Sequence, residues 1–269
     1  MRKNKSTIWI NIMRLNSRNS IPDMQVLGRT SDLHVYAPEN FRQVLDFFLG
    51  TFGEGMKYSI DYVPLDMKKP ELVYESKTVE LLAFPLNHRI DTFGFIIREK
   101  VPPFNVHKDA IARYGLTVAE IGALKRGEDV IRPAGLLAQP CIENGFRPCS
   151  GTDEPLVISN AEAAYRPYEP RSYAYCSDTA PFPELAEWVR GVTLLYHEAT
   201  FPVEMTEMAA KTFHSTTVQA AQTALAAGVG RLIVGHYSSR YPSVKFFLDE
   251  LRAIFPDTDL TRDGDVFEI

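Results

Sequence analysis

Short apolar runs that end in a titratable side chain recur along this chain. The clearest is Leu232–Val234, which has the length of a buried strand and is followed by Gly235 and His236. Three more runs have the same form, and they end at His88, at Asp178 and at His197-Glu198. One such coincidence is common, whereas four in one chain are not. The pattern therefore predicts a site assembled from the ends of strands.

The same apolar periodicity predicts an alternation of strands and helices. Strands are expected at residues 33–38, 58–63, 78–86, 92–98, 173–176, 192–197 and 231–235, with a last short one near Val266. Helices are expected at 40–48, broken by Gly50, Gly53 and Gly55, and at 106–126, 183–190, 216–228 and 243–254. The strongest helix signal is the capping box of Thr216 with Gln219, in a helix that Gly228 ends.

Two segments differ from the rest in composition. Residues 1–20 carry five basic side chains and no acidic one, which is typical of a flexible basic tail or a short irregular helix. Residues 99–170 are rich in proline, and between Arg98 and Arg126 six basic residues stand against three acidic ones. This predicts a projecting insertion. The alternative is that residues 99–170 are a solvated surface segment that binds no partner.

Composition narrows the class of protein. A chain of 269 residues, 45% apolar and 23% charged, is an ordinary globular protein of one large domain or two small ones. A net charge of -5 argues against a protein that binds nucleic acid over its whole surface, but it is compatible with a local basic patch. Three cysteines without a C-x-x-C pair indicate a reducing compartment. No apolar run suits a membrane span or a signal peptide, so a cytoplasmic location is expected.

His88, Asp178 and His236 are the candidates for metal binding. Imidazole and carboxylate groups suit zinc, and the two oxygens of Asp178 could bridge two ions roughly 3.5–4 Å apart. Their long, unequal spacing means that the fold would have to assemble the site. Taken singly, a histidine after a strand is more often a structural residue than a ligand, and Asp178 could form an Asx turn.

His214 is the candidate for proton transfer. It precedes the capped helix, whose dipole is expected to lower the pKa of the imidazole, and it could act as a general acid. Glu198 could orient His214 by a hydrogen bond, whereas His197 should point to the opposite face of its strand. The chain has no G-x-S-x-G elbow, Walker loop or dinucleotide-binding glycine motif, so the commonest serine hydrolase, NTPase and NAD readings are excluded.

Taken together, the motifs resemble a known family. Ordered blocks over about residues 24–269 are similar to ribonuclease Z, the tRNA 3′-processing endonuclease family of the metallo-β-lactamase superfamily. They are Leu27–Thr30, Leu33–Pro38, Pro85–His88, Tyr175–Thr179, His197–Phe201, His214–Thr216 and Gly235–Tyr241.

The resemblance implies an α/β (α+β) fold, an αββα sandwich with two zinc ions at one edge. His88 would bind one zinc, Asp178 would bridge both, and His236 would bind the second. His214 would act on the leaving oxygen, with Glu198 beside it. Residues 99–130 would begin an arm that grips the tRNA precursor, and the chain would form a homodimer.

The N-terminal part of the chain, before Leu27, departs from the family pattern. The family's H-x-H-x-D-H motif should precede Leu27, yet no histidine stands before His34 and residues 1–23 are an atypical basic segment. We expect an N-terminally truncated fold without half of the metal ligands, with weak or no zinc binding and very slow hydrolysis. The basic residues 1–20 are expected to come from an alternative start or a shifted reading frame. The alternatives are a non-catalytic remnant that binds tRNA or dimerises, and a phosphodiesterase for small substrates.

Overall fold

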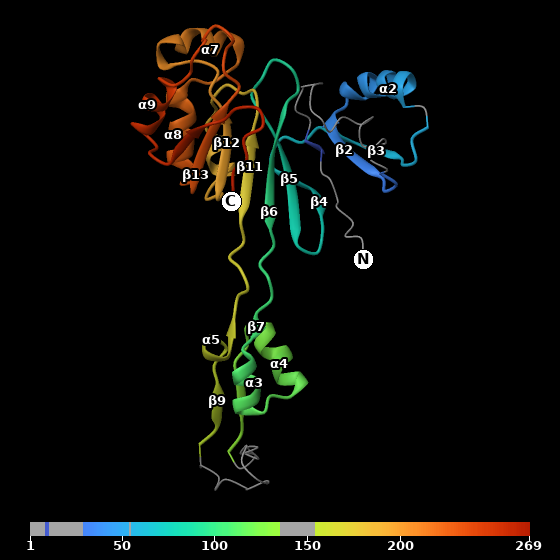
Figure 1. Cartoon of the computed structure of the whole chain (residues 1–269), viewed down its shortest axis with the longest axis vertical. Helices are drawn as coiled ribbons and strands as arrows, with labels where there is room; N and C mark the ends of the chain where they lie inside the picture. The colour runs from blue at the N-terminus through green and yellow to red at the C-terminus, as the bar shows by residue number, and fades with distance from the viewer. Residues whose placement is uncertain (1–8, 11–28, 54, 135–153) are drawn as a thin grey trace. The chain divides into compact units, whose positions relative to one another are not determined.

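The computed structural model describes residues 9–10, 29–53, 55–134 and 154–269 (Figure 1). Contacts divide the chain into two compact units. The first unit comprises Met1–Glu99 and Arg171–Ile269, and the second comprises Lys100–Pro170. The predicted basic segment, residues 1–23, lies outside the described residues except for Trp9–Ile10. The predicted arm, residues 99–130, falls within the second unit except for Glu99, and its function stays a prediction.

A mixed sheet forms the centre of the first unit, in the order β14-β13-β12-β11-β6-β5-β4. Its strands are β4 (Glu71–Glu75), β5 (Val79–Pro85), β6 (Phe93–Glu99), β11 (Ser172–Cys176), β12 (Leu194–Glu198), β13 (Arg231–Gly235) and β14 (Thr258–Leu260). From β11 to β14 neighbouring strands are parallel, and from β4 to β11 they are antiparallel. The carboxyl ends of β11, β12 and β13 therefore share one edge, and β5 runs in the same direction.

Three helices pack on this sheet: α6 (Glu184–Trp188), α8 (Thr217–Ala227) and α9 (Phe247–Arg252). Buried strand residues such as Leu195 and Val234 meet the alanine face of α8, which lets helix and sheet approach closely. The capping box of Thr216 and Gln219 is confirmed, and so is the left-handed Gly228 that ends α8. The short 3₁₀ turn η1 (Val203–Met205) and α7 (Thr206–Thr212) precede α8.

A smaller parallel sheet joins β1 (Trp9–Ile10), β2 (Leu33–Pro38) and β3 (Ile60–Leu65). Helix α2 (Phe41–Phe52) packs on it through Leu45. The predicted end at Phe48 was too early, because the helix continues through Gly50 to Phe52 and stops at Gly53, one of the three glycines expected to break it.

The second unit consists of short elements around a small core of its own. They are β7 (Asn105–Val106), α3 (Lys108–Tyr114), α4 (Val118–Lys125), β8 (Val130–Arg132), β9 (Leu156–Ile158), α5 (Asn160–Ala163) and β10 (Ala164–Tyr165). The single helix predicted over 106–126 was wrong. Gly115 takes a left-handed conformation at the end of α3, and Thr117 caps α4 in a capping box with Glu120.

The predicted strands before residue 240 are present, but the last one was misplaced. It lies at Thr258–Leu260, where it pairs with β13, and Val266 is 89% exposed. The predicted turn at 88–91 is confirmed as the connection of the β5–β6 hairpin, closed by a hydrogen bond from the Leu86 amide to the Thr92 carbonyl.

The ion pair of Glu120 with Arg132 should make the stability of the second unit depend on pH. The hydrogen bonds from Arg132, at 2.7 and 3.0 Å, lower the pKa of Glu120 from 4.5 to about 2. A lowered pKa in the folded state stabilises the fold above pH 4.5, and the contribution is lost as pH falls towards 2. We expect Glu120→Gln to lower the local stability by roughly 1–2 kcal/mol, less than the full pKa shift would give, because solvent partly screens the pair. Amide hydrogen exchange in α4 near neutral pH measures this.

Glu128→Gln is the matched control, because the pair of Glu128 with Arg126 is exposed. It should change exchange in α4 little. A carboxyl of Glu120 that titrates at its ordinary pKa in a carbon-13 NMR titration would contradict the prediction.

Candidate metal-dependent active site

The parallel strands bring the predicted residues to one edge of the large sheet. Register pairs Cys176 with His197 and Glu198 with Gly235, so the residues that follow β11 and β13 emerge beside the end of β12. The loop after β5 joins them, because the Ala180 amide bonds to the Asn87 carbonyl at 2.8 Å. His88, Asp178, Glu198 and His236 are thereby gathered where the sequence predicted a site.

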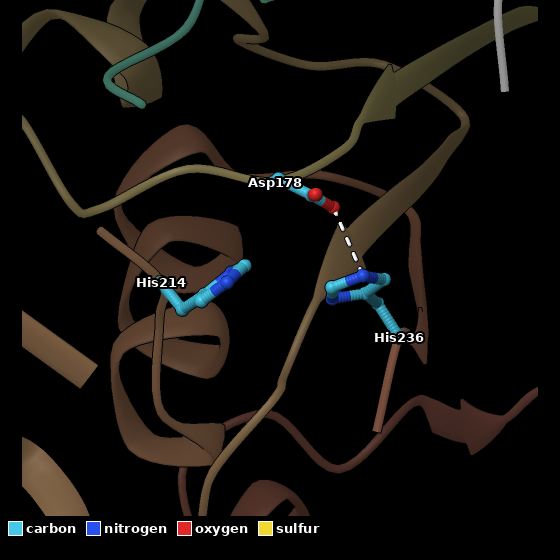
Figure 2. A group of neighbouring side chains, drawn as sticks. All are labelled: Asp178, His214 and His236. Atoms are coloured by element: carbon cyan, nitrogen blue, oxygen red, sulfur yellow. Dashed lines mark ion pairs between the residues drawn. The ribbon is translucent and has the colours of Figure 1, made fainter. Parts of the chain in front are cut away.

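His214 reaches the same edge from the loop between α7 and α8. The Ser215 hydroxyl donates to the Thr179 carbonyl at 2.7 Å and fixes this loop beside Asp178. The His214 ring then lies between two others, with ring centres 5.1 Å from His88 and 5.2 Å from His236. In Figure 2 the side chains of Asp178, His214 and His236 converge from separate segments on one space.

These three side chains could hold a metal ion. Each of Asp178, His214 and His236 offers one ligand atom, and these atoms all lie within 4.8 Å of one another. His88 is not part of this group, although its ring faces His214. Because His214 belongs to this group, the geometry allows two roles for it, as a ligand of the ion or as the proton donor that the sequence predicts.

The chemistry of Asp178 and His236 fits a cation. Asp178 Oδ1 lies 3.2 Å from His236 Nε2, close to the roughly 3.3 Å that separates two ligands of a tetrahedral zinc ion. When Nε2 carries a lone pair, two electron-pair donors face each other and need a positive charge between them. A proton on Nε2 or a bound metal ion would supply it.

The Nδ1 atoms of two histidines are held by acceptors. His88 Nδ1 donates to the Phe213 carbonyl at 2.9 Å, and His214 Nδ1 donates to Glu198 Oε1 at 2.8 Å. A carbonyl or carboxylate oxygen can only accept, so Nδ1 carries the proton in both rings. Nε2 is therefore the nitrogen left for a metal ion or a substrate, as in metal sites where a second group orients the ligand.

Two residues beside the site have a left-handed backbone. Phe213 has φ 60° and His236 has φ 61°, and no other non-glycine residue does so in the described part of the chain. Phe213 ends α7 in this conformation and turns its carbonyl toward His88. Strained backbone of this kind is concentrated at functional sites, which supports a functional reading of this corner.

Glu198 is a fully buried carboxylate that holds the groups around the site in place through hydrogen bonds. Its Oε1 accepts from the Thr179 amide at 2.9 Å and from His214, and its Oε2 accepts from the Thr200 amide at 3.1 Å and hydroxyl at 2.6 Å. Burial raises the pKa of Glu198, but the hydrogen bonds from His214 and Thr200 outweigh it and hold the pKa below its usual value. Glu198 is therefore ionised.

The pKa predicted for His214 was wrong in direction. Burial lowers it, but the hydrogen bond and the negative charge of Glu198, together with Asp178, raise it above the ordinary value. The dipole of α8 is outweighed because a buried carboxylate at 2.8 Å exerts a stronger field than the partial charge of a helix end. A raised pKa favours the protonated ring that a general acid needs.

Two contributors had no separate signal in the sequence. Thr200 lies two residues after Glu198 and contacts His236, and Phe213 supplies the carbonyl for His88. His197 lies in the core on the opposite face, as predicted. Its Nδ1 donates to the Glu198 carbonyl, and its buried Nε2 has no partner among the described residues.

No family model matches this chain, but individual proteins of known family are similar to it. Ribonuclease Z of Bacteroides fragilis (strain YCH46) is 35% identical over 239 residues, which are 89% of this chain and 72% of that protein.

Two solved structures show the fold. One is a metallo-β-lactamase fold protein from Bacillus subtilis, with TM-score 0.52, 11% identity and coverage of 91% of this chain and 69% of that one. The other is human tRNase Z, short form, with TM-score 0.52, 16% identity and coverage of 93% and 73%. The chain has the metallo-β-lactamase fold and belongs to the ribonuclease Z family.

Proposed function

We propose that this chain is a zinc-dependent endoribonuclease that removes 3′ trailers from tRNA precursors. The observation that carries this is the convergence of Asp178, His214 and His236 on one space, supported by the buried carboxylate of Glu198. Membership of the ribonuclease Z family supports the choice of substrate. The donor set of imidazoles and a carboxylate suits zinc.

Each side chain has a role in this proposal. His88 would bind one zinc, Asp178 would bridge two ions, and His236 would bind the second. Bound zinc supplies a Lewis acid and a water of lowered pKa. The protonated His214 donates a proton from Nε2 to the leaving ribose oxygen, while Glu198 holds its Nδ1 at 2.8 Å and keeps the ring in place.

We further propose that cleavage by this chain alone is slow. None of the six histidines has another histidine two residues away, so the given sequence contains no H-x-H-x-D-H motif. His88, Asp178 and His236 then supply two protein ligands for each of two ions, with Asp178 counted twice. Catalytic zinc sites ordinarily have three.

The second unit is proposed as the arm that contacts the tRNA precursor. The guanidinium of Arg166 lies 4.4 Å from the centre of the Phe104 ring, and Tyr165 and Tyr168 are exposed nearby in the sequence. Cations and aromatic faces are the groups that contact phosphates and unpaired bases. A homodimer and a cytoplasmic location belong to the same proposal. No helix in the described residues is long and apolar enough to cross a membrane.

Metal content and cleavage, measured in one preparation, test the proposal. Purified chain is analysed for zinc and then mixed in excess with a tRNA precursor that carries a labelled 3′ trailer. We expect slow, single-site cleavage at the trailer, together with bound zinc. His236→Ala and Asp178→Asn should each abolish cleavage and lower the zinc content, because each removes a ligand of the same ion.

His34→Ala and Asp61→Asn are matched controls, since these two exposed residues bond to each other outside the site. Both should cleave like the unchanged chain. RNA binding that persists with a chelator, without any cleavage, would instead support a non-catalytic tRNA-binding protein. Hydrolysis of small phosphodiesters without tRNA cleavage would support the third reading.

A further inference from the structure

The polar groups of Thr179 bond to three different segments around the site. Its amide donates to Glu198 Oε1 at 2.9 Å, and its carbonyl accepts from the Ser215 hydroxyl at 2.7 Å. Its hydroxyl oxygen accepts from the Asn87 amide at 3.1 Å and donates its own proton to the Ala180 carbonyl at 2.8 Å. Thr179 is 0% exposed, so water does not reach these groups unless the structure opens locally.

Each bonded segment carries a side chain of the site in the position next to the bond. The neighbours are Asn87 with His88, Thr179 with Asp178, and Ser215 with His214. Because neighbouring Cα atoms are about 3.8 Å apart, a shift of the bonded residue is passed on to the side chain beside it. The bonds of Thr179 therefore set where these three side chains stand relative to one another.

The link to the His88 segment depends on the Thr179 side chain, whereas the other two do not. The amide and carbonyl of Thr179 are backbone groups that any residue except proline would keep. The bond to Asn87 needs a hydroxyl that can accept. A second bond, from the Ala180 amide to the Asn87 carbonyl at 2.8 Å, holds the other backbone group of Asn87. One bond would let the loop turn about it, and two fix its direction.

We infer that Thr179 is a positioning residue whose hydroxyl locks the loop that carries His88 to the turn that carries Asp178. That role rests on the proposed function, in which His88 and Asp178 bind zinc, but the placement itself exists without metal or RNA. A ligand that is already in place binds without the cost of ordering its loop. Groups that orient a metal ligand typically change metal affinity 10–100-fold when they are replaced.

NMR of the metal-free protein tests the placement through amide hydrogen exchange and ring-to-ring nuclear Overhauser contacts. Thr179→Val has the shape of threonine without the hydroxyl. It should speed exchange of the Asn87 amide roughly 5–10-fold, the usual worth of one hydrogen bond. The contact between the rings of His88 and His214, whose centres are 5.1 Å apart, should weaken. Thr179→Ser keeps the hydroxyl and should behave like the unchanged chain in both measurements.

Thr193→Val is the matched control. The Thr193 hydroxyl accepts from the Ser172 amide at 3.0 Å and so joins the starts of β11 and β12, at the opposite end of these strands from the site. Its loss should leave exchange at Asn87 unchanged. Ser215→Ala removes the link to the His214 segment instead, so exchange at Asn87 should again stay unchanged.

Zinc titration of the same proteins gives a readout that a purely structural bond would not move. Affinity for the ion that His88 would bind should fall by roughly 10–100-fold in Thr179→Val and stay within about threefold in Thr179→Ser. Faster exchange at Asn87 with unchanged zinc affinity would overturn the positioning role. A Thr179→Ser protein that behaves like Thr179→Val would show a packing role of the methyl group and would overturn it as well.

An Asn87 amide that exchanges freely in the unchanged chain would also overturn the positioning role, even if Thr179→Val failed to fold. Absence of zinc binding or of tRNA cleavage in the unchanged chain would count against the proposed function. The NMR result for the placement of His88 would then still stand, so the two failures can be told apart.

Discussion

His214→Ala should lower the rate of tRNA 3′ cleavage by roughly 10²–10⁴-fold, the usual contribution of a general acid, without lowering the zinc content. The physical reason is the pairing with Glu198. That carboxylate holds Nδ1 at 2.8 Å and, with Asp178, raises the pKa of the ring, so the protonated form is available to a leaving oxygen. Single-turnover cleavage with the chain in excess, followed by elemental analysis, measures both quantities.

The zinc content decides between two roles for His214, since it lies within reach of the ion that Asp178 and His236 could hold. If His214→Ala loses zinc as His236→Ala does, then His214 is a ligand and the assigned role is wrong. His34→Ala serves as the control for loss of a histidine, because His34 is exposed and its ring bonds to Asp61, outside the site.

Glu198→Ala should lower the free energy of unfolding by about 3–5 kcal/mol, the usual cost of removing one partner of a buried charged pair. Four donors now share this carboxylate: two backbone amides, the Thr200 hydroxyl and the His214 ring. Alanine would leave them buried without an acceptor, and each unsatisfied group costs about 1–3 kcal/mol unless water enters. Denaturant unfolding followed by circular dichroism gives the number.

Glu198→Gln and Glu207→Ala complete this experiment. Glutamine keeps one acceptor oxygen and the shape of the side chain, so its loss of stability should be smaller than that of alanine. Glu207 is an exposed glutamate on α7, and its replacement should change stability by less than about 0.5 kcal/mol. Equal stability of Glu198→Ala and the unchanged chain would mean that the buried network does not form.

The placement of the site was predictable because its signal is local. Asp178, Glu198 and His236 each close or follow a short apolar strand, and neighbouring parallel strands necessarily end at one edge. The contribution of Thr200 was not predictable, since it depends on a contact with a residue 36 positions away and on the left-handed backbone there. The pKa of His214 was mispredicted for the same reason, because burial of Glu198 beside it is a property of the fold.

The strands and helices can likewise be divided into those that the sequence predicts and those that it does not. Strands with strong apolar character, such as β12 and β13, follow directly from the pattern. β14 does not, because Thr258–Leu260 is held mainly by backbone pairing with β13 and carries little apolar signal. The break between α3 and α4 was hidden because apolar spacing continues across Gly115, although the chain turns there.

The left-handed Phe213 has a consequence for the engineering of this protein. A non-glycine residue in this conformation costs roughly 1–2 kcal/mol, so glycine at 213 would relax the backbone. The same change would make the backbone that carries this carbonyl, 2.9 Å from His88 Nδ1, more flexible, because glycine has no Cβ to restrict it. A campaign that selects only for thermostability would therefore favour glycine at this position and loosen the imidazole beside it. At position 213, the residue that favours folding stability therefore differs from the residue that best holds His88 in place.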